Sequence, residues 1–321
     1  GSIFQQFYNM ADTIIVGRTI SVEALAAVGA TGSISFLIVG FVQGVTSGFA
    51  VITAQRFGAG SENGVRRSVA TSIILGIAVT IVMTAISVLA ARPLLEIMKT
   101  PSDIIDDSYN YIIVIFEGIA AAVFFNLFSS ILRSLGDSKT PLVFLIIASI
   151  INIILDFVFI LTFKMGVAGA AIATVTGQIC AAILAITFNL TKNPDVHISF
   201  KGFKPQIIFV KNILSVGIPS IIMSSVGSAM TFGMNKILIT FSSTAVAVFG
   251  VYFKLNSFVF MPVFGLNNGM VPIVSYNYGA QNKKRLTKTI KLAIMYAVCI
   301  MFIGIMLFQF IPDVLLKLFD A

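Results

Sequence analysis

Long apolar runs dominate this sequence, and only short polar segments interrupt them. A run of about 18 or more apolar residues is long enough to cross the hydrocarbon core of a bilayer as a helix. Only 11% of the residues are charged, against about 25% in soluble domains, so an ordinary water-soluble fold is excluded. The pattern predicts an all-α polytopic membrane protein with nine transmembrane helices, at residues 3–19, 24–56, 68–91, 108–134, 140–161, 167–190, 208–241, 244–277 and 287–311.

The distribution of basic residues predicts how the chain is oriented. Thirteen Lys and Arg lie on one side of the predicted membrane and five on the other, and cytoplasmic loops carry the excess of positive charge. We therefore expect a multi-pass protein of the cytoplasmic membrane whose basic loops are cytoplasmic. These loops are residues 57–67, 133–139, 191–211 and 279–291. Because the basic residues form short clusters between apolar runs, membrane lipid is an expected partner and nucleic acid is not.

An internal repeat divides the chain into two lobes. The N-lobe (1–191) and the partial C-lobe (208–321) flank a cytoplasmic linker at 192–207, the longest polar stretch. Six predicted helices separate the two copies, so we expect parallel repeats related by an axis along the membrane normal. A shift of 221 residues aligns Ala24, Ala26, Gly29, Gly44, Gly48, Ile52, Gly58 and Ala59 with Ala245, Ala247, Gly250, Gly265, Gly269, Ile273, Gly279 and Ala280.

The same register predicts that the repeat is incomplete at both ends. The seventh predicted helix carries Gly217-Ile218-Pro219-Ser220 at its opening, and the counterparts of these residues fall at or before the first residue of the chain, so the first helix is expected to be truncated. Three helices follow the third helix of the repeat in the N-lobe, and none follows it in the C-lobe. We therefore expect about nine of twelve helices, with the last three absent.

A carboxylate inside an apolar helix is the strongest functional signal. A charge there costs roughly 3 to more than 10 kcal/mol, so such residues usually face a water-filled cavity. At 1.5 Å per residue, Asp12, Asp156 and Thr174 all lie about 10 Å inside the outer boundary, and Asn152 is one turn from Asp156. These oxygen-bearing side chains suit Na⁺ or a bound proton. The alternative is that the two carboxylates only satisfy structural hydrogen bonds.

Three further polar residues lie within predicted spans. Glu117 either faces the same cavity or serves as a structural partner, and Asn126, a lone amide, favours an interhelical hydrogen bond over a ligand role. Lys254 lies near the membrane midplane and is expected to face a cavity between the lobes. The chain has a single histidine, His197, so a zinc site of the usual kind is not expected.

Several short motifs give the chain a family resemblance that covers essentially all of it. In order, they are Gln5-Gln6, Asn9-Met10-Ala11-Asp12-Thr13-Ile14-Ile15-Val16-Gly17-Arg18, Ala54-Gln55-Arg56-Phe57-Gly58-Ala59-Gly60, Leu132-Arg133-Ser134-Leu135-Gly136-Asp137-Ser138-Lys139-Thr140-Pro141, Asn152 with Asp156, and Gly217-Ile218-Pro219-Ser220. With these motifs the chain resembles the multidrug and toxic compound extrusion (MATE) family.

The resemblance implies a two-lobe bundle that alternates between inward-open and outward-open forms. It implies export of cationic or amphipathic drugs in exchange for Na⁺ or H⁺, a monomer, no enzymatic activity and no cofactor besides the coupling ion. It also assigns the cation site to Asp12, Asn152, Asp156 and Thr174. The missing helices and the acidic Glu117 depart from the family pattern.

Two alternatives stay open at this point. A lipid-linked oligosaccharide flippase shares this general architecture, but it would be expected to line its cavity with several basic side chains, and here only Lys254 is deep. A membrane scaffold or receptor without transport would pair its buried acids structurally, so substituting them would damage stability and not flux.

Overall fold

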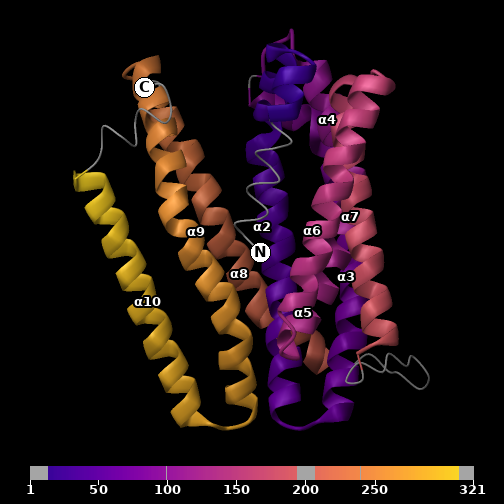
Figure 1. The fold of residues 1–321 in the computed structure, drawn as a ribbon, viewed down its shortest axis with the longest axis vertical. Coiled ribbons are helices and arrows are strands. Elements are labelled where there is room, and N and C mark those ends of the chain that lie inside the picture. The colour runs from indigo at the N-terminus through magenta and orange to yellow at the C-terminus, as the bar shows by residue number, and fades with distance from the viewer. Residues whose placement is uncertain (1–13, 99, 194–206, 239, 311–321) are drawn as a thin grey trace.

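The computed structural model describes residues 14–98, 100–193, 207–238 and 240–310, and within these ranges the regular structure is entirely helical. Residues 14–19 form a short helical segment ahead of the labelled elements (Figure 1). The elements are α2 (Val22–Gly58), α3 (Glu62–Ile97), α4 (Ile105–Glu117), α5 (Ile119–Ser134), α6 (Lys139–Asp156), the π-helix η1 (Phe157–Thr162), α7 (Gly166–Thr191), α8 (Ile207–Leu238), α9 (Ser243–Gly279) and α10 (Lys283–Phe310).

Seven of these helices are long and apolar enough to cross a membrane, or eight if α4 and α5 form one span bent by 43°. The eight predicted spans from 24–56 onward correspond to these helices, with 108–134 divided into α4 and α5 and 140–161 into α6 and η1. The first predicted span, 3–19, lies mostly outside the described residues, so the total of nine stays a prediction.

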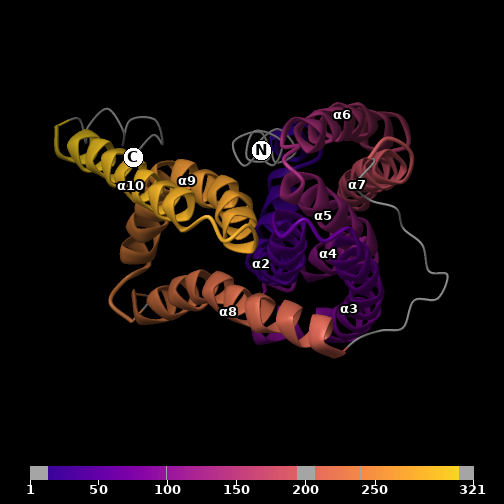
Figure 2. The ribbon, with the colours of Figure 1, turned by 90° about the horizontal axis from the view of Figure 1, so that it is seen from below.

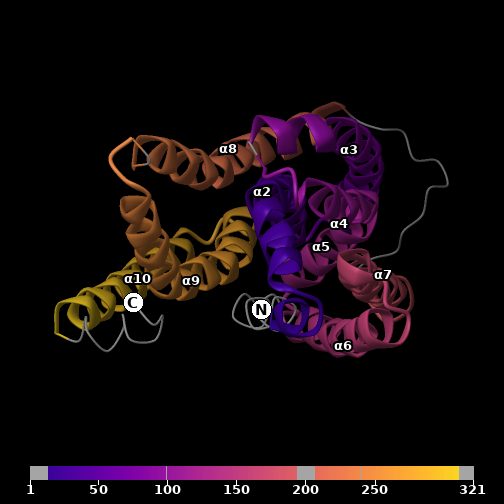
Figure 3. The ribbon, with the colours of Figure 1, turned by 90° about the horizontal axis from the view of Figure 1, so that it is seen from above.

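The helices form two groups that meet along α2. Helices α2 to α7 make one bundle, and α8, α9 and α10 lie beside it (Figure 1). Seen along the helices, α8 and the α9–α10 pair diverge from α2 as two arms (Figures 2 and 3). Helix α2 packs against α3, α4 and α5 on one side and against α8 and α9 on the other. It therefore makes most of the contacts between the two lobes, to which α3 adds a smaller contact with α8 and α5 one with α9.

Two glycines let α8 approach the backbone of α2 closely. A Cβ atom on Gly44 would lie 2.6 Å from the backbone nitrogen of Ile221, and one on Gly48 would lie 2.5 Å from the carbonyl oxygen of Ile213. Neither contact leaves room for a side chain. Small residues play this role between membrane helices, where van der Waals packing replaces the hydrophobic effect as the driving force.

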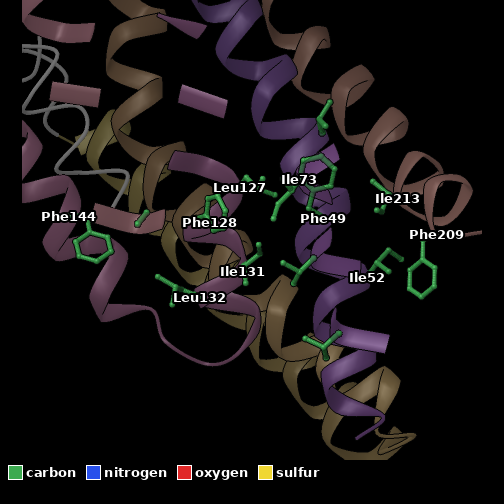
Figure 4. Close-up of a cluster of buried hydrophobic side chains, with 14 residues drawn as sticks. Phe49, Ile52, Ile73, Leu127, Phe128, Ile131, Leu132, Phe144, Phe209 and Ile213 are labelled. Carbon is green, nitrogen blue, oxygen red and sulfur yellow. The ribbon is translucent and has the colours of Figure 1, made fainter. Parts of the chain in front are cut away.

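One face of the first turns of α8 is buried in the core of the first bundle. Phe209 and Ile213 join a cluster of fourteen buried residues that includes Phe49 and Ile52 of α2 (Figure 4). The Arg56 guanidinium lies over the Phe209 ring, 5.2 Å from its centroid. The two lobes are therefore joined by side-chain packing as well as by the chain itself.

Hydrogen bonds fix α2 within its own bundle. The Ser134 hydroxyl of α5 donates to the Ala50 carbonyl at 2.8 Å, and the Ser108 hydroxyl of α4 donates to the Ala27 carbonyl at 3.1 Å. The hydroxyls of Thr53 on α2 and Ser68 on α3 lie 2.9 Å apart.

The predicted repeat is visible in the turns that join α2 to α3 and α9 to α10. Each turn contains a residue with positive φ, Gly60 at 67° and Gln281 at 54°. Each then ends on a capping side chain: Ser61 accepts the N–H of Gly64 at 3.2 Å, and Asn282 accepts the N–H of Arg285 at 3.1 Å. The paired residues are all 221 positions apart, and both turns lie at the lower end of the molecule in Figure 1.

Candidate functional site

Two polar residues of the predicted cation site lie one turn apart near the end of α6. Asn152 and Asp156 are both fully buried, and Asp156 is the last residue of the α-helical part. The π-helix η1 follows immediately. A π-helical turn widens the backbone and is frequent at functional sites. The span that the sequence predicts as one regular helix therefore changes its winding at the carboxylate.

Thr174 on α7 completes the described part of this group. Its side chain is 8% exposed, and the Asn152 amide donates a hydrogen bond to its hydroxyl oxygen at 3.3 Å. The close approach of α6 and α7 depends on Gly177, where a Cβ would lie 3.0 Å from the Ala148 carbonyl oxygen and 3.2 Å from the Asn152 Cβ. The structure therefore joins Asn152 to Thr174 across two helices, and the buried Asp156 lies one turn further along α6.

The side-chain oxygen of Asn152 takes no part in the hydrogen bond to Thr174, which uses the amide nitrogen. This oxygen, Oδ1, is buried and accepts no hydrogen bond from the described part of the chain. A buried amide oxygen without a donor is costly, commonly about 1–3 kcal/mol. Together with the neighbouring Asp156 carboxylate it forms an oxygen-rich surface that suits a small cation.

The fourth predicted ligand, Asp12, lies outside the described residues. In the described residues that follow, Ile14 is exposed, whereas Ile15 and Val16 are buried in a cluster with Ile160 of η1 and Ala170 of α7. The chain that follows Asp12 is therefore packed against the same two elements that flank Asp156 and Thr174.

A cavity of about 100 Å³ lies inside the first bundle, between α2, α4, α5, α6 and α7. Ala148 and Gly177 line it, and these are the residues that contact each other beside Asn152, so the cavity adjoins the polar group. Most of its wall is apolar, with Phe116 and Phe125 the largest side chains. Its polar lining residues are Ser35, Gln43, Asn126, Ser149 and Gln178.

The other polar residues named from the sequence have different positions. Asn126 lines the cavity, and its amide also donates to the Ala122 carbonyl at 2.8 Å. Glu117 is exposed at the bend between α4 and α5, and its neighbours Ile115 and Phe116 line the cavity while it does not. The side chain of Lys254 is not among those the structure describes.

Sequence reasoning missed four polar residues of the cavity wall, Ser35, Gln43, Ser149 and Gln178. The spacing of two of them in the sequence could have identified them. Ser149 lies three residues before Asn152, and Gln178 lies four residues after Thr174, so each shares a helix face with a predicted ligand. Ser35 and Gln43 have no such neighbour in the sequence, and only the tertiary packing of α2 places them here.

Comparison with known proteins supports one family. The MatE family model matches residues 1–158 and 219–321. The probable multidrug resistance protein YpnP of Bacillus subtilis is 27% identical over 89% of this chain and 64% of its own length. The probable multidrug resistance protein NorM of Thermotoga maritima is 27% identical over 100% of the chain and 69% of its own length. The multidrug export protein MepA of Staphylococcus aureus is 24% identical, with 92% and 65% covered.

Solved structures agree with this result. A crystal structure of MATE in the bent conformation superposes with a TM-score of 0.92 at 27% identity and covers 100% of this chain and 72% of that one. An outward-facing multidrug resistance MATE family transporter of the MOP superfamily gives a TM-score of 0.88 at 27% identity, with 98% and 70% covered. The chain thus spans about two thirds of the length of the proteins it matches.

Proposed function

This chain belongs to the MATE family, and from that premise we propose that it acts as a secondary active transporter exporting cationic or amphipathic drugs in exchange for Na⁺ or H⁺. The curated relatives YpnP, NorM and MepA are named for multidrug resistance or export. None of these names refers to a flippase, so the flippase alternative is not favoured. The chain covers only 64% of YpnP, so the activity of the whole relative is a proposal for this protein.

The single observation that carries the ion-coupling proposal is the assembly of Asn152, Asp156 and Thr174 in one buried site. Asn152 and Asp156 have no exposed surface, and the amide of Asn152 is held by Thr174 at 3.3 Å. Such a group, with Asp12 as the fourth member, offers carboxylate, amide and hydroxyl oxygens to a small cation. The coupling ion is a co-substrate of the transport cycle.

The cavity beside this site is the part of the molecule that we propose binds the drug. Its mixture of aromatic walls and amide or hydroxyl groups suits an amphipathic cation. Its volume of about 100 Å³ holds roughly three water molecules, whereas drug-sized sites measure about 300–1,000 Å³. A drug therefore requires the bundle to expand, and a cation at Asp156 would favour a different packing of the same helices.

The energy available for exchange depends on the charge of the drug. When one cation enters for each uncharged amphipathic drug that leaves, the net charge that crosses 100 mV is worth about 2.3 kcal/mol, which corresponds to a concentration ratio of roughly fiftyfold. When the drug carries one positive charge, one-for-one exchange moves no net charge, and the concentration gradient of the coupling ion supplies the energy. Export follows if the inward cation and the outward drug each bind one conformation better than the other. With the basic loops on the cytoplasmic side, drug would leave the cell as the cation enters.

Dye efflux from cells that express the protein tests this function. We expect ethidium efflux that stops when one gradient is collapsed, and separate ionophores for Na⁺ and for protons identify the coupling ion. Asp12→Asn and Asp156→Asn should each abolish efflux, because the amide keeps the size of the side chain but loses its charge and its ability to bind a proton.

Glu117→Gln is the matched control, since it neutralises another carboxylate of the α4–α5 span that is exposed and outside the cavity wall. Its efflux should match that of the unmodified protein. Normal efflux from Asp156→Asn would remove the site from the mechanism, and no efflux from the well-inserted unmodified protein would overturn drug export itself.

A further inference from the structure

The first turns of α10 carry an unusual concentration of positive charge. Residues 283–291 contain five basic side chains and no acidic one. Lys284, Lys288 and Lys291 follow one another at helical spacings of four and three, so they lie on one face of the helix. All three are exposed. This face lies at the end of the molecule where α9 turns into α10, at the bottom of Figure 1.

These lysines line a shallow groove, which we call the α10 lysine groove. Its other walls are Thr287, Leu292 and Met295, with Met295 50% exposed. The cationic part of the groove is at the start of a helix that spans the membrane, and the apolar part lies further along the same helix. The groove therefore passes from positive charge to apolar surface in the direction in which a phospholipid passes from headgroup to acyl chain.

The protein offers these lysines little negative charge of its own. The sequence contains no Asp or Glu between Asp195 and Asp313, although ten Lys and Arg lie in that interval. The two ion pairs found within the described ranges both involve Arg92, near the opposite end of α3. Within the described ranges no acidic side chain forms an ion pair with a lysine of the groove, so this positive charge is available to a partner from outside the chain.

The internal repeat provides a reference for how much charge the fold requires here. The equivalent first turns of α3 carry Glu62, Arg66 and Arg67, which leaves one net positive charge where α10 has five. Both helices begin after equivalent turns, so both begin on the same side of the membrane. The equivalent turns of α3 serve the same orientation of the chain with one net positive charge. The further positive charge on α10 is therefore more than orientation alone requires.

We propose that the α10 lysine groove binds an anionic phospholipid, with the lysines on the phosphate and headgroup charges and Leu292 and Met295 against the acyl chain. Clusters of four to eight basic residues beside a transmembrane helix attract anionic lipids, and each Lys near the surface contributes about fivefold in affinity. The groove lysines are exposed and form no ion pair within the described ranges, so their charge complements that of an anionic lipid.

Fluorescence quenching by brominated lipids tests this proposal directly. The chain contains no tryptophan, so Met295→Trp places a single reporter in the groove. The variant is reconstituted into vesicles of brominated phosphatidylglycerol or brominated phosphatidylcholine mixed with the unbrominated lipids. We expect the quenching to show that phosphatidylglycerol binds in the groove with about fivefold or higher affinity than phosphatidylcholine. High salt should reduce this preference.

Two double variants in the Met295→Trp background separate the groove from general surface charge. Lys284→Gln with Lys288→Gln should bring the preference close to one, whereas Arg66→Gln with Arg67→Gln, exposed at the equivalent turns of α3, should leave it unchanged. Equal effects of the two pairs would overturn the proposal, as would equal quenching by both lipids. Loss of the preference in millimolar inorganic phosphate would also overturn it, because the groove would then be a site for free phosphate.

Discussion

At the residue scale, the hydrogen bond between Asn152 and Thr174 links the two helices of the candidate cation site. Thr174→Val keeps the shape of the side chain but removes the acceptor, so the buried Asn152 amide loses its partner. Interhelical hydrogen bonds in membranes are worth about 0.6 kcal/mol on average and at most about 1.7. We expect the free energy of unfolding to fall by about 1 kcal/mol and dye efflux to decrease with it.

Thermal unfolding in detergent and efflux measured on the same variants check this expectation. Thr191→Val is the control on the same helix, because Thr191 is exposed and its hydroxyl donates only within α7, to the Thr187 carbonyl. Thr174→Ser should restore both properties. If Thr174→Val unfolds and transports like Thr191→Val, the hydrogen bond has no role in stability or function.

Part of this site was predictable from single residues, for a physical reason. Charged or amide side chains are rare in apolar helices, so Asp156 and Asn152 are conspicuous in the sequence, and their spacing of four fixes a common face. The contact at Gly177 was not predictable, because a glycine in a membrane helix carries no indication of which backbone it will touch. Only the packed structure shows that Gly177 lets Ala148 and Asn152 of α6 approach α7 closely.

At the scale of elements, the length of the apolar runs predicted the described spans but not their irregularities. The 140–161 span changes from α6 to a π-helix after Asp156, and the 108–134 span bends by 43° between α4 and α5. An apolar run long enough to span the bilayer has the same hydropathy whether its winding is α or π. Neither break coincides with a proline, the residue that usually signals one.

The bend between α4 and α5 is accessible to a direct test through Gly118. A Cβ there would lie 2.4 Å from Cγ2 of Val175 on α7, too close for either atom to stay in place. We expect Gly118→Ala to lower the free energy of unfolding by about 1–3 kcal/mol, as overpacking of a core typically does. Adding Val175→Ala should recover most of that loss, because it removes the opposing methyl groups.

A double-mutant cycle from thermal unfolding measures this coupling. Gly76→Ala on α3 is the control, since its Cβ would meet Leu127 at an ordinary 3.4 Å and alanine favours a helix. Additive effects of Gly118→Ala and Val175→Ala would contradict the proposed contact.

At the scale of the whole molecule, the two lobes meet at a contact that the repeat makes twice. Gly58 of α2 lies against the Tyr276 carbonyl oxygen of α9, and Gly279 of α9 lies against the Gln55 carbonyl oxygen of α2. Gln55 and Tyr276 are 221 residues apart, as are Gly58 and Gly279. The sequence predicted the repeat and its parallel direction, but a register shift contains no information on whether the two copies touch.

This paired contact closes one end of the molecule, and it requires glycine on both sides. A Cβ on Gly58 or Gly279 would overlap backbone, which cannot rotate away as a side chain can. We expect the double variant Gly58→Ala with Gly279→Ala to destabilise the closed arrangement by about 1–3 kcal/mol. A change of that size shifts the ratio of closed to open molecules by roughly 5- to 150-fold, since 1.4 kcal/mol corresponds to a factor of ten.

Distances between spin labels at Asn63→Cys and Lys284→Cys, with Cys180 and Cys299 replaced, report this equilibrium because both positions are exposed beside the contact. The short-distance population should fall in the double variant. Gly29→Ala with Gly250→Ala is the matched control: these residues are also 221 apart, and no described atom lies within 4 Å of a Cβ at either. An unchanged distance distribution in the Gly58 and Gly279 variant would mean that the lobes do not depend on this contact to stay closed.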